Sequence, residues 1–160
     1  MHRNAPLTPQ GRLLLCRRIE SGRPIIVVPY IQKRGLALER VVVCWDGGRT
    51  AARAIADAMP LLERAKAVDI AIIAEERKND EISGASMSEQ LARHGVAATI
   101  KRIAKGDIAV QDAILDYAAD SGADLIVMGG YGHSRLREFI LGGVTRGILN
   151  SMTVPVLMSH

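Results

Sequence analysis

A stretch of glycines, hydroxyls and bases follows a short apolar run late in the chain. Residues 124–128 (DLIVM) are of strand length, and residues 129–137 after them read GGYGHSRLR. Glycines at the end of a strand let backbone amides approach a ligand closely, because no Cβ stands in the way. Successive amides of this kind form a concave nest for an anion, and a helix N-terminus behind them adds a partial positive charge. The pattern favours a phosphate-binding loop.

The same glycines also suit a strand-to-helix turn that needs them for steric reasons alone, so spacing by itself leaves both interpretations open. A P-loop is excluded, because no Gly-Lys-Ser/Thr follows at the required interval. A dinucleotide fingerprint requires G-x-G-x-x-G, and after Gly130 and Gly132 the third glycine is replaced by Arg135. Arg135 and Arg137 fit a phosphate contact and an exposed helix face equally well.

The spacing of these glycines resembles the nucleotide-binding signature of the universal stress protein family. Gly129 and Gly132 are followed, after nine residues, by Gly142. The family's pattern continues with Ser or Thr, then Val and often Thr, whereas this chain has Gly143, Val144 and Thr145. The resemblance covers roughly residues 38–160. The departure at Gly143 removes a hydroxyl that family members would ordinarily offer to a phosphate.

The resemblance implies an ATP site between two strand ends. Asp46 would bind the adenosine end, Ala74 would line the base pocket, and Met128 and Gly129 would border the ribose and phosphates. The other implied phosphate contacts are Gly132, His133, Ser134, Gly142, Gly143, Val144 and Thr145. Any Mg²⁺ would arrive with the nucleotide. Without the resemblance, Asp46 is equally well explained as a turn residue before two glycines.

Apolar runs of strand length alternate with helical patterns along the chain. The predicted strands are 41–45, 68–74, 96–103, 124–128 and 156–158. Continuous apolar runs are typical of parallel strands covered on both faces, and the strand–helix alternation favours a doubly wound sheet. The sequence therefore predicts an α/β fold with a five-stranded parallel sheet. The resemblance implies the Rossmann-type arrangement of the adenine-nucleotide α-hydrolases, whose ligands lie at the carboxyl ends of the strands.

Three helices between these strands carry local signals. The first has apolar residues on one face from Ala51 to Leu62, and Pro60 is expected to kink or restart it. Residues 75–84 are predicted to be an exposed loop before a short helix at 86–93, which ends ahead of Gly95. The helix predicted at 108–120 takes Asp107 as its N-cap and ends at Gly122.

The first 37 residues are predicted to lie outside the main domain, which spans residues 38–160. Residues 1–10 are expected to be disordered. Residues 11–29 then repeat the order of the chain's end: a helical segment, a small polar break, a proline and an apolar strand. Because family members often carry two domains in tandem, we interpret residues 11–29 as the remnant of a preceding domain. Coincidence is the alternative, since any α/β domain can present this order twice.

The last strand is apolar and is predicted at a sheet edge, which invites pairing with another strand. The resemblance implies a homodimer in which this strand pairs antiparallel with its mate. Residues 24–28 are a second candidate for that edge, as an extra N-terminal strand from the same chain or from a second one.

Composition argues against several classes of protein. The net charge is +4, but the residues before Gly35 carry seven bases against Glu20 alone, a net of +6, which leaves −2 for the remainder. With five aromatic residues and no basic folded face, nucleic-acid binding is not expected. No apolar stretch has the length of a membrane span. Cys16 and Cys44 lie in apolar runs, which favours packed, reduced thiols and a cytoplasmic protein.

Catalytic and metal-binding patterns are weak. His133 lies in the glycine loop, but no carboxylate is placed to orient it, so a phosphate contact is favoured over a general base. His2, His94 and His160 lack ligand spacing, and Asp124 lies at the wrong end of its strand for Mg²⁺. We therefore expect a nucleotide-binding stress-response protein that senses or signals. A slow ATPase or other nucleotide-using enzyme, and a degenerate structural domain without ligand, are the alternatives.

Overall fold

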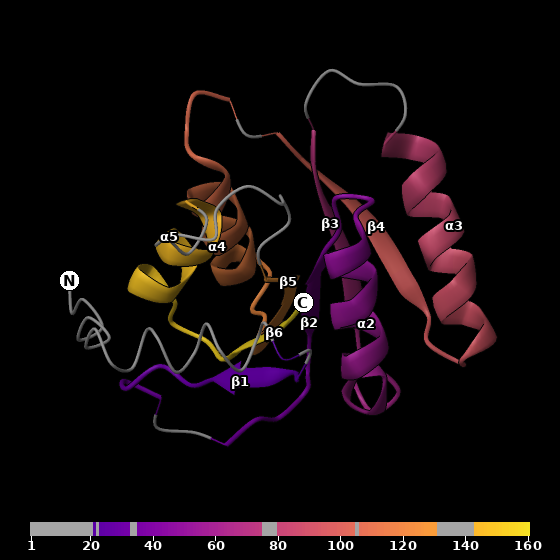
Figure 1. The fold of residues 1–160 in the computed structure, drawn as a ribbon, viewed down its shortest axis with the longest axis horizontal. Coiled ribbons are helices and arrows are strands. Elements are labelled where there is room, and N and C mark those ends of the chain that lie inside the picture. The colour runs from indigo at the N-terminus through magenta and orange to yellow at the C-terminus, as the bar shows by residue number, and fades with distance from the viewer. Residues whose placement is uncertain (1–20, 22, 33–34, 75–79, 105, 131–142) are drawn as a thin grey trace.

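The computed structural model describes residues 21, 23–32, 35–74, 80–104, 106–130 and 143–160. These residues form one six-stranded sheet with helices on both of its faces (Figure 1). In chain order the elements are β1 (Ile25–Val27), β2 (Val41–Cys44), α2 (Arg49–Leu62), β3 (Val68–Ala74), α3 (Asp80–Arg93), β4 (Ala98–Ala104), α4 (Val110–Asp120), β5 (Leu125–Gly129), α5 (Gly143–Ser151) and β6 (Val156–Ser159).

The strand order is β1-β6-β5-β2-β3-β4, and all pairs from β6 to β4 are parallel. The predicted five-stranded parallel, doubly wound sheet is therefore confirmed. From β2 the chain moves outward through β3 to β4, and then it returns to the other side of β2 with β5 and β6. The order thus reverses between β2 and β5, which is the point where open α/β sheets bind ligands.

Two apolar cores lie on the two faces of the sheet. One face packs against α2 and α3 through residues such as Val41, Ile55 and Leu91, and the other packs against α4 and α5 through Val42 and Ile148. Figure 1 shows the two helix pairs on opposite sides of the strands. Adjacent residues of β2 thus serve different cores, because successive side chains of a strand point to opposite faces. This double burial explains the unbroken apolar runs of the sequence.

The N-terminal strand β1 pairs antiparallel with β6 within the same chain, with Ile26 opposite Leu157. The predicted extra edge strand is confirmed, and it is intramolecular. The edge of β6 that was expected to carry a homodimer is occupied, so a dimer through β6 would require β1 to leave. The homodimer stays a prediction.

Local predictions for α3 and α4 were wrong. Helix α3 begins at Asp80, so residues 80–84 are helical and not part of a loop; Gly84 is buried, and a Cβ there would lie 2.6 Å from Ile72 Cδ1. Of the two outcomes expected at Pro60, the restart does not occur, because α2 runs through Pro60 and ends two residues later. Ala109, not Asp107, is the N-cap of α4, and no side chain caps that helix.

The glycine signals at two helix ends are confirmed. Gly95 after α3 and Gly122 after α4 have φ of +77° and +68°, the left-handed region that glycine adopts most easily. The amide of Val96 donates to Leu91 O, and that of Ala123 donates to Ala118 O. Both ends therefore bond their last carbonyls as Schellman motifs do.

The buried carboxylate of Asp69 forms hydrogen bonds near the amino-terminal ends of the parallel strands, away from their carboxyl ends. Asp69 in β3 is 2% exposed, and its Oδ2 accepts hydrogen bonds from Arg40 Nη1 at 2.7 Å and from the Tyr117 hydroxyl at 3.0 Å. A buried carboxylate is tolerated because a cation and a hydroxyl compensate the lost hydration. Asp69 therefore links the start of β2, β3 and α4, and its role is structural.

We predict that Tyr117→Phe lowers the free energy of unfolding by about 1.5 kcal/mol, because the variant loses a hydrogen bond to a charged group. Burial, and then the bond to Asp69, raise the pKa of Tyr117 from 10.0 to about 12. Since the folded-state pKa is the higher one, this contribution is complete below pH 10.0 and is lost as the pH rises to about 12.

Urea unfolding of wild type and Tyr117→Phe at neutral and at alkaline pH measures both effects. Tyr30→Phe is the control, because Tyr30 is 79% exposed. The stability gap between wild type and Tyr117→Phe should narrow at alkaline pH. A gap that widens there, or an equal loss in Tyr30→Phe, would contradict the prediction.

Candidate functional site

The carboxyl end of β2 leads directly into the first turn of α2. Asp46 is exposed, and its Oδ1 accepts a hydrogen bond from the amide of Gly48 at 2.8 Å. Gly48 is the N-cap of α2, no side chain caps the helix, and its first turn holds no acidic residue. The first amides of α2 are therefore not occupied by a capping side chain, and they carry the positive end of the helix dipole. The start of α2 therefore carries a partial positive charge beside the Asp46 carboxylate.

The end of β5 packs directly against this helix start at Gly129. A Cβ at Gly129 would lie 2.7 Å from Ala51 N, from the Thr50 carbonyl carbon and from Thr50 Oγ1. Real Cβ atoms do not approach backbone this closely, so the contact requires glycine. The structure thus brings together two of the predicted site residues, Asp46 and Gly129, on either side of the first turn of α2.

A hydrogen-bonded chain of three elements holds the peptide after Gly129. The amide of Gly130 donates to Ser159 O at 2.7 Å, and the buried Ser159 hydroxyl donates to Asp57 Oδ2 at 2.5 Å. Asp57 Oδ2 also accepts from Arg53 Nε at 2.9 Å, so α2 is attached to the end of β6 as well as to β5. The first two glycines of the predicted loop therefore begin from a fixed position.

Two further predicted residues lie at the same edge of the sheet. Ala74 ends β3, three residues beyond the point where Cys44 of β2 pairs with Ala71, so the strand projects past β2. Met128 is 5% exposed and belongs to the core beneath α4 and α5. The Met128 side chain therefore packs in the core, so only its backbone could make the predicted contact with a ribose.

The remaining predicted residues divide between α5 and undescribed positions. Gly143 is the exposed first residue of α5, Val144 is half-buried, and Thr145 is 4% exposed. Because α5 connects two parallel strands, it must start at their carboxyl edge, the edge of Asp46 and Gly129. Four predicted contacts lie outside the described residues: Gly132, His133, Ser134 and Gly142. The prediction that the glycine loop and the start of α5 converge on one phosphate site depends on these four residues.

Other reactive side chains near this edge are few. Burial, and then the charge of Asp46, raise the pKa of the Cys44 thiol to about 12, so this thiol stays protonated and packed as the sequence predicted. No cluster of three metal-ligating side chains occurs among the described residues. The carboxylate of Asp124 accepts hydrogen bonds from the amides of Glu39 and Arg40, which precede β2. Asp124 therefore lies at the amino-terminal edge of the sheet.

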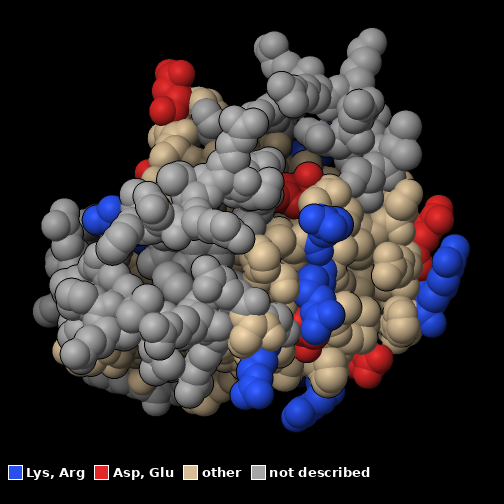
Figure 2. Space-filling view, viewed as in Figure 1, with Lys and Arg blue, Asp and Glu red and all other residues tan. Residues whose placement is uncertain are grey.

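Charge on the visible face is mixed. Figure 2 shows both acidic and basic side chains on the described part of that face, with basic side chains in a short column at its centre and acidic ones beside it. A nucleic-acid footprint would gather bases along one groove or helix. No helix within the described ranges is long and apolar enough to cross a membrane.

Sequence reasoning missed three features that shape the site and its support. The bond between Ser159 and Asp57 joins residues 102 positions apart, and nothing in the sequence pairs them. The packing of Gly129 on α2 could not be separated from an ordinary turn. Asp69 did carry a signal, because it is a charged residue between apolar neighbours in a strand that is buried on both faces.

The fold and this edge together define a class: a doubly wound α/β domain with a glycine-bearing loop and a helix N-terminus at its topological switch point. A family model described as the universal stress protein family matches residues 37–160. The chain belongs to this family. The predicted identity is thereby confirmed, while the division into a main domain and a remnant remains a proposal.

Individual relatives match over different lengths. A universal stress protein of Synechocystis is 40% identical over 47 residues, 29% of this chain and 16% of the relative. A universal stress protein structure from Archaeoglobus fulgidus matches with a TM-score of 0.78 and 21% identity over 98% of this chain and 57% of that chain. A universal stress protein solved in complex with cAMP matches with a TM-score of 0.62 and 25% identity. The match covers 76% of this chain and 96% of that chain. This chain thus spans little more than half of the Archaeoglobus protein.

We predict that Gly129→Ala lowers the free energy of unfolding by about 1–3 kcal/mol, the usual cost of overpacking, because its Cβ must push β5 and α2 apart. Gly143→Ala is the matched control: within the described part of the chain no neighbouring atom is found within 4 Å of its Cβ position, and its φ is not positive. The control should leave stability unchanged or raise it by up to about 1 kcal/mol, because alanine favours the helix. Chemical unfolding measures both, and equal stability of Gly129→Ala and wild type would contradict the packing argument.

Proposed function

We propose that this protein binds ATP at the carboxyl edge between β2 and β5 and acts in the cytoplasm as a stress-response sensor or signalling module. The observation that carries the proposal is that Asp46 accepts a hydrogen bond from Gly48 at the uncapped start of α2, and that Gly129 packs against the first turn of the same helix. This is where doubly wound sheets place ligands. The family, and the relative solved with cAMP, favour an adenine nucleotide.

In the proposed site a carboxylate contacts the adenosine end of the nucleotide, and backbone amides contact its phosphates. Asp46 receives the adenosine end, with Ala74 on the projecting end of β3 beside the base. The backbone of Met128 and Gly129 borders the ribose. The phosphates take the loop contacts Gly132, His133, Ser134 and Gly142 and the α5 contacts Gly143, Val144 and Thr145, with any Mg²⁺ held by the phosphates themselves.

The energies permit such a site without a lysine. Micromolar binding needs about 8 kcal/mol. Hydrogen bonds to a charged phosphate contribute roughly 1.5–3 kcal/mol each, and a helix terminus contributes roughly 0.3–1 kcal/mol. Three or four amide contacts and some burial of the base therefore suffice. Because Gly143 lacks a hydroxyl, we expect weak to moderate affinity.

Calorimetric titration with ATP tests the proposal directly. Trp45, the chain's single tryptophan, adjoins Asp46 and gives a second signal in its fluorescence. Asp46→Asn should weaken ATP binding by about tenfold, or 1.4 kcal/mol, because it removes the charge of the side chain. The variant keeps an Oδ1 acceptor for the amide of Gly48. Glu63→Gln, at the far end of α2, is the control. Absence of heat at millimolar ATP, or equal affinity in Asp46→Asn, would refute the site.

Restoring the hydroxyl at the start of α5 is predicted to tighten ATP binding. The position of Gly143 is exposed and open, so Gly143→Ser fits without strain. One added hydrogen bond to a charged phosphate is worth roughly 1.5–3 kcal/mol, which corresponds to roughly ten- to 150-fold in affinity. Gly143→Ala separates the hydroxyl from the loss of glycine. If serine and alanine give the same affinity, the hydroxyl does not reach a phosphate.

A further inference from the structure

Thr50 places a hydroxyl inside the contact between α2 and β5. Its Oγ1 lies 2.7 Å from the position that a Cβ of Gly129 would occupy, so the hydroxyl lies against the backbone of β5. Thr50 is the second residue of α2 and is half-buried. Within the described part of the chain its hydroxyl has no hydrogen-bond partner. Because half-buried polar groups usually find a partner, this hydroxyl is available to a ligand of the proposed nucleotide site.

The two central strands separate next to this hydroxyl. The pairing of β2 with β5 ends at Val43 and Val127. Beyond that point β2 stays attached to β3, since the amide of Trp45 donates to Ala71 O at 2.9 Å, and β5 continues to pair with β6 up to Gly129. The last residues of the two strands thus bond to their outer neighbours and not to each other. The sheet therefore divides at the switch point, between the residues that lead to Asp46 and those that lead to the glycine loop.

Asp46 and Thr50 flank this division from its two sides. Asp46 follows β2, whereas the Thr50 hydroxyl contacts the end of β5. Asp46 Oδ1 accepts the hydrogen bond from the amide of Gly48, and Oδ2 has no hydrogen bond to any described residue. A carboxylate oxygen, which only accepts, and a hydroxyl, which donates and accepts, are therefore both available at the switch point.

Of the parts of a nucleotide, the sugar suits this pair of side chains best. A phosphate would be repelled by the carboxylate of Asp46, since both groups are negatively charged. The two neighbouring hydroxyls of a ribose carry no charge, and each of them can donate or accept a hydrogen bond. One can donate to Asp46 Oδ2 while the other bonds to Thr50 Oγ1. The backbone of Gly129, which borders the ribose in the proposed site, lies against the same threonine.

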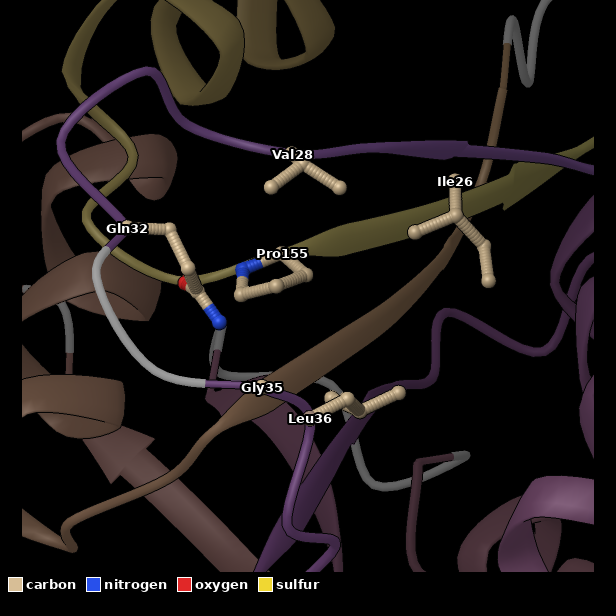
Figure 3. A pocket seen from close by; sticks show the side chains of 6 residues that line it. All are labelled: Ile26, Val28, Gln32, Gly35, Leu36 and Pro155. Carbon is tan, nitrogen blue, oxygen red and sulfur yellow. The ribbon is translucent and has the colours of Figure 1, made fainter.

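The apolar groove at the β1 edge offers no such partners to a sugar. It spans about 430 Å³ beside Pro155, which precedes β6, and so lies toward the amino-terminal edge of the sheet. Figure 3 shows the side chains of Ile26, Val28 and Leu36 around it. Gln32 supplies the one polar side chain among its lining residues, and none of these residues is charged. The hydrogen-bonding pair for a ribose is therefore at the carboxyl edge.

We propose that Thr50 recognises the ribose of the bound nucleotide by a hydrogen bond between its Oγ1 and one of the two neighbouring sugar hydroxyls, while Asp46 Oδ2 accepts from the other. This inference rests on the proposed ATP function and adds a residue that determines specificity for the sugar. Thr50 makes the site select ribonucleotides over the deoxy analogue that lacks the contacted hydroxyl.

Calorimetric titrations of Thr50→Ser and Thr50→Ala with ATP, 2′-deoxy-ATP and 3′-deoxy-ATP test the proposal, because the two variants differ from each other only by the hydroxyl. Thr50→Ser should bind ATP as wild type does, and Thr50→Ala should bind it roughly two- to tenfold more weakly, the effect of one hydrogen bond between neutral groups. Toward the analogue that lacks the contacted hydroxyl the two variants should bind equally. A role of Thr50 in packing alone would not produce this dependence on the sugar.

Thr99→Ala, at an exposed position on β4, is the control and should bind all three nucleotides as wild type does. Chemical unfolding checks the fold of each variant. Should Thr50→Ala lose stability through its missing methyl group, Thr50→Val keeps the shape of the side chain and tests the same hydroxyl.

Equal ATP affinity of Thr50→Ser and Thr50→Ala would overturn this inference, and so would a serine–alanine difference that is the same for ATP and for both analogues. The proposed function fails separately from it. Wild-type protein that binds no ATP at millimolar concentration would overturn both proposals. ATP binding that weakens in Asp46→Asn but is unchanged in Thr50→Ala would overturn the role of Thr50 alone.

Discussion

The close contact between the end of β5 and the first turn of α2 determines the geometry of the whole carboxyl edge. Gly129 leaves no space for a side chain, so the backbone of β5 lies against Thr50 and Ala51. The strand order reverses at the same place, because β2 and β5 are neighbours whose connections leave in opposite directions. A helix start, the carboxylate of Asp46 and the glycine at the end of β5 therefore lie at the switch point, where sheets of this kind bind ligands.

The rest of the fold keeps this contact in place. Asp57 of α2 accepts a hydrogen bond from the Ser159 hydroxyl, and Ser159 O accepts one from the amide of Gly130, so hydrogen bonds connect the helix with the ends of both strands. At the other edge Asp69 joins β2, β3 and α4 through Arg40 and Tyr117. The two polar clusters lie at opposite ends of the parallel strands, and the apolar cores fill both faces between them. The carboxyl edge, where the nucleotide site is proposed, is thus separated from the amino-terminal edge that carries the buried Asp69 cluster.

Sequence reasoning predicted the elements well where burial controls them. The runs at Val41 and Leu125 are apolar throughout because both faces of these strands are covered, as is typical of a parallel sheet between helix layers. It failed where a helix is polar: α3 begins at Asp80 because Gly84 packs on Ile72, a tertiary contact that outweighs glycine's poor helix propensity. Asp107 was a reasonable cap by type, but the helix starts later, after Ala109.

By itself the sequence determined the strand–helix alternation, the parallel sheet, the family and the residue types of the candidate site, because hydrophobic periodicity and glycine spacing are local properties. Tertiary structure decided which distant segments touch. It packed Gly129 against the first turn of α2, which follows Asp46, turned the Met128 side chain into the core, and paired β6 with β1 of the same chain. These are outcomes of packing between segments far apart in the chain, and local patterns carry no information about such distances.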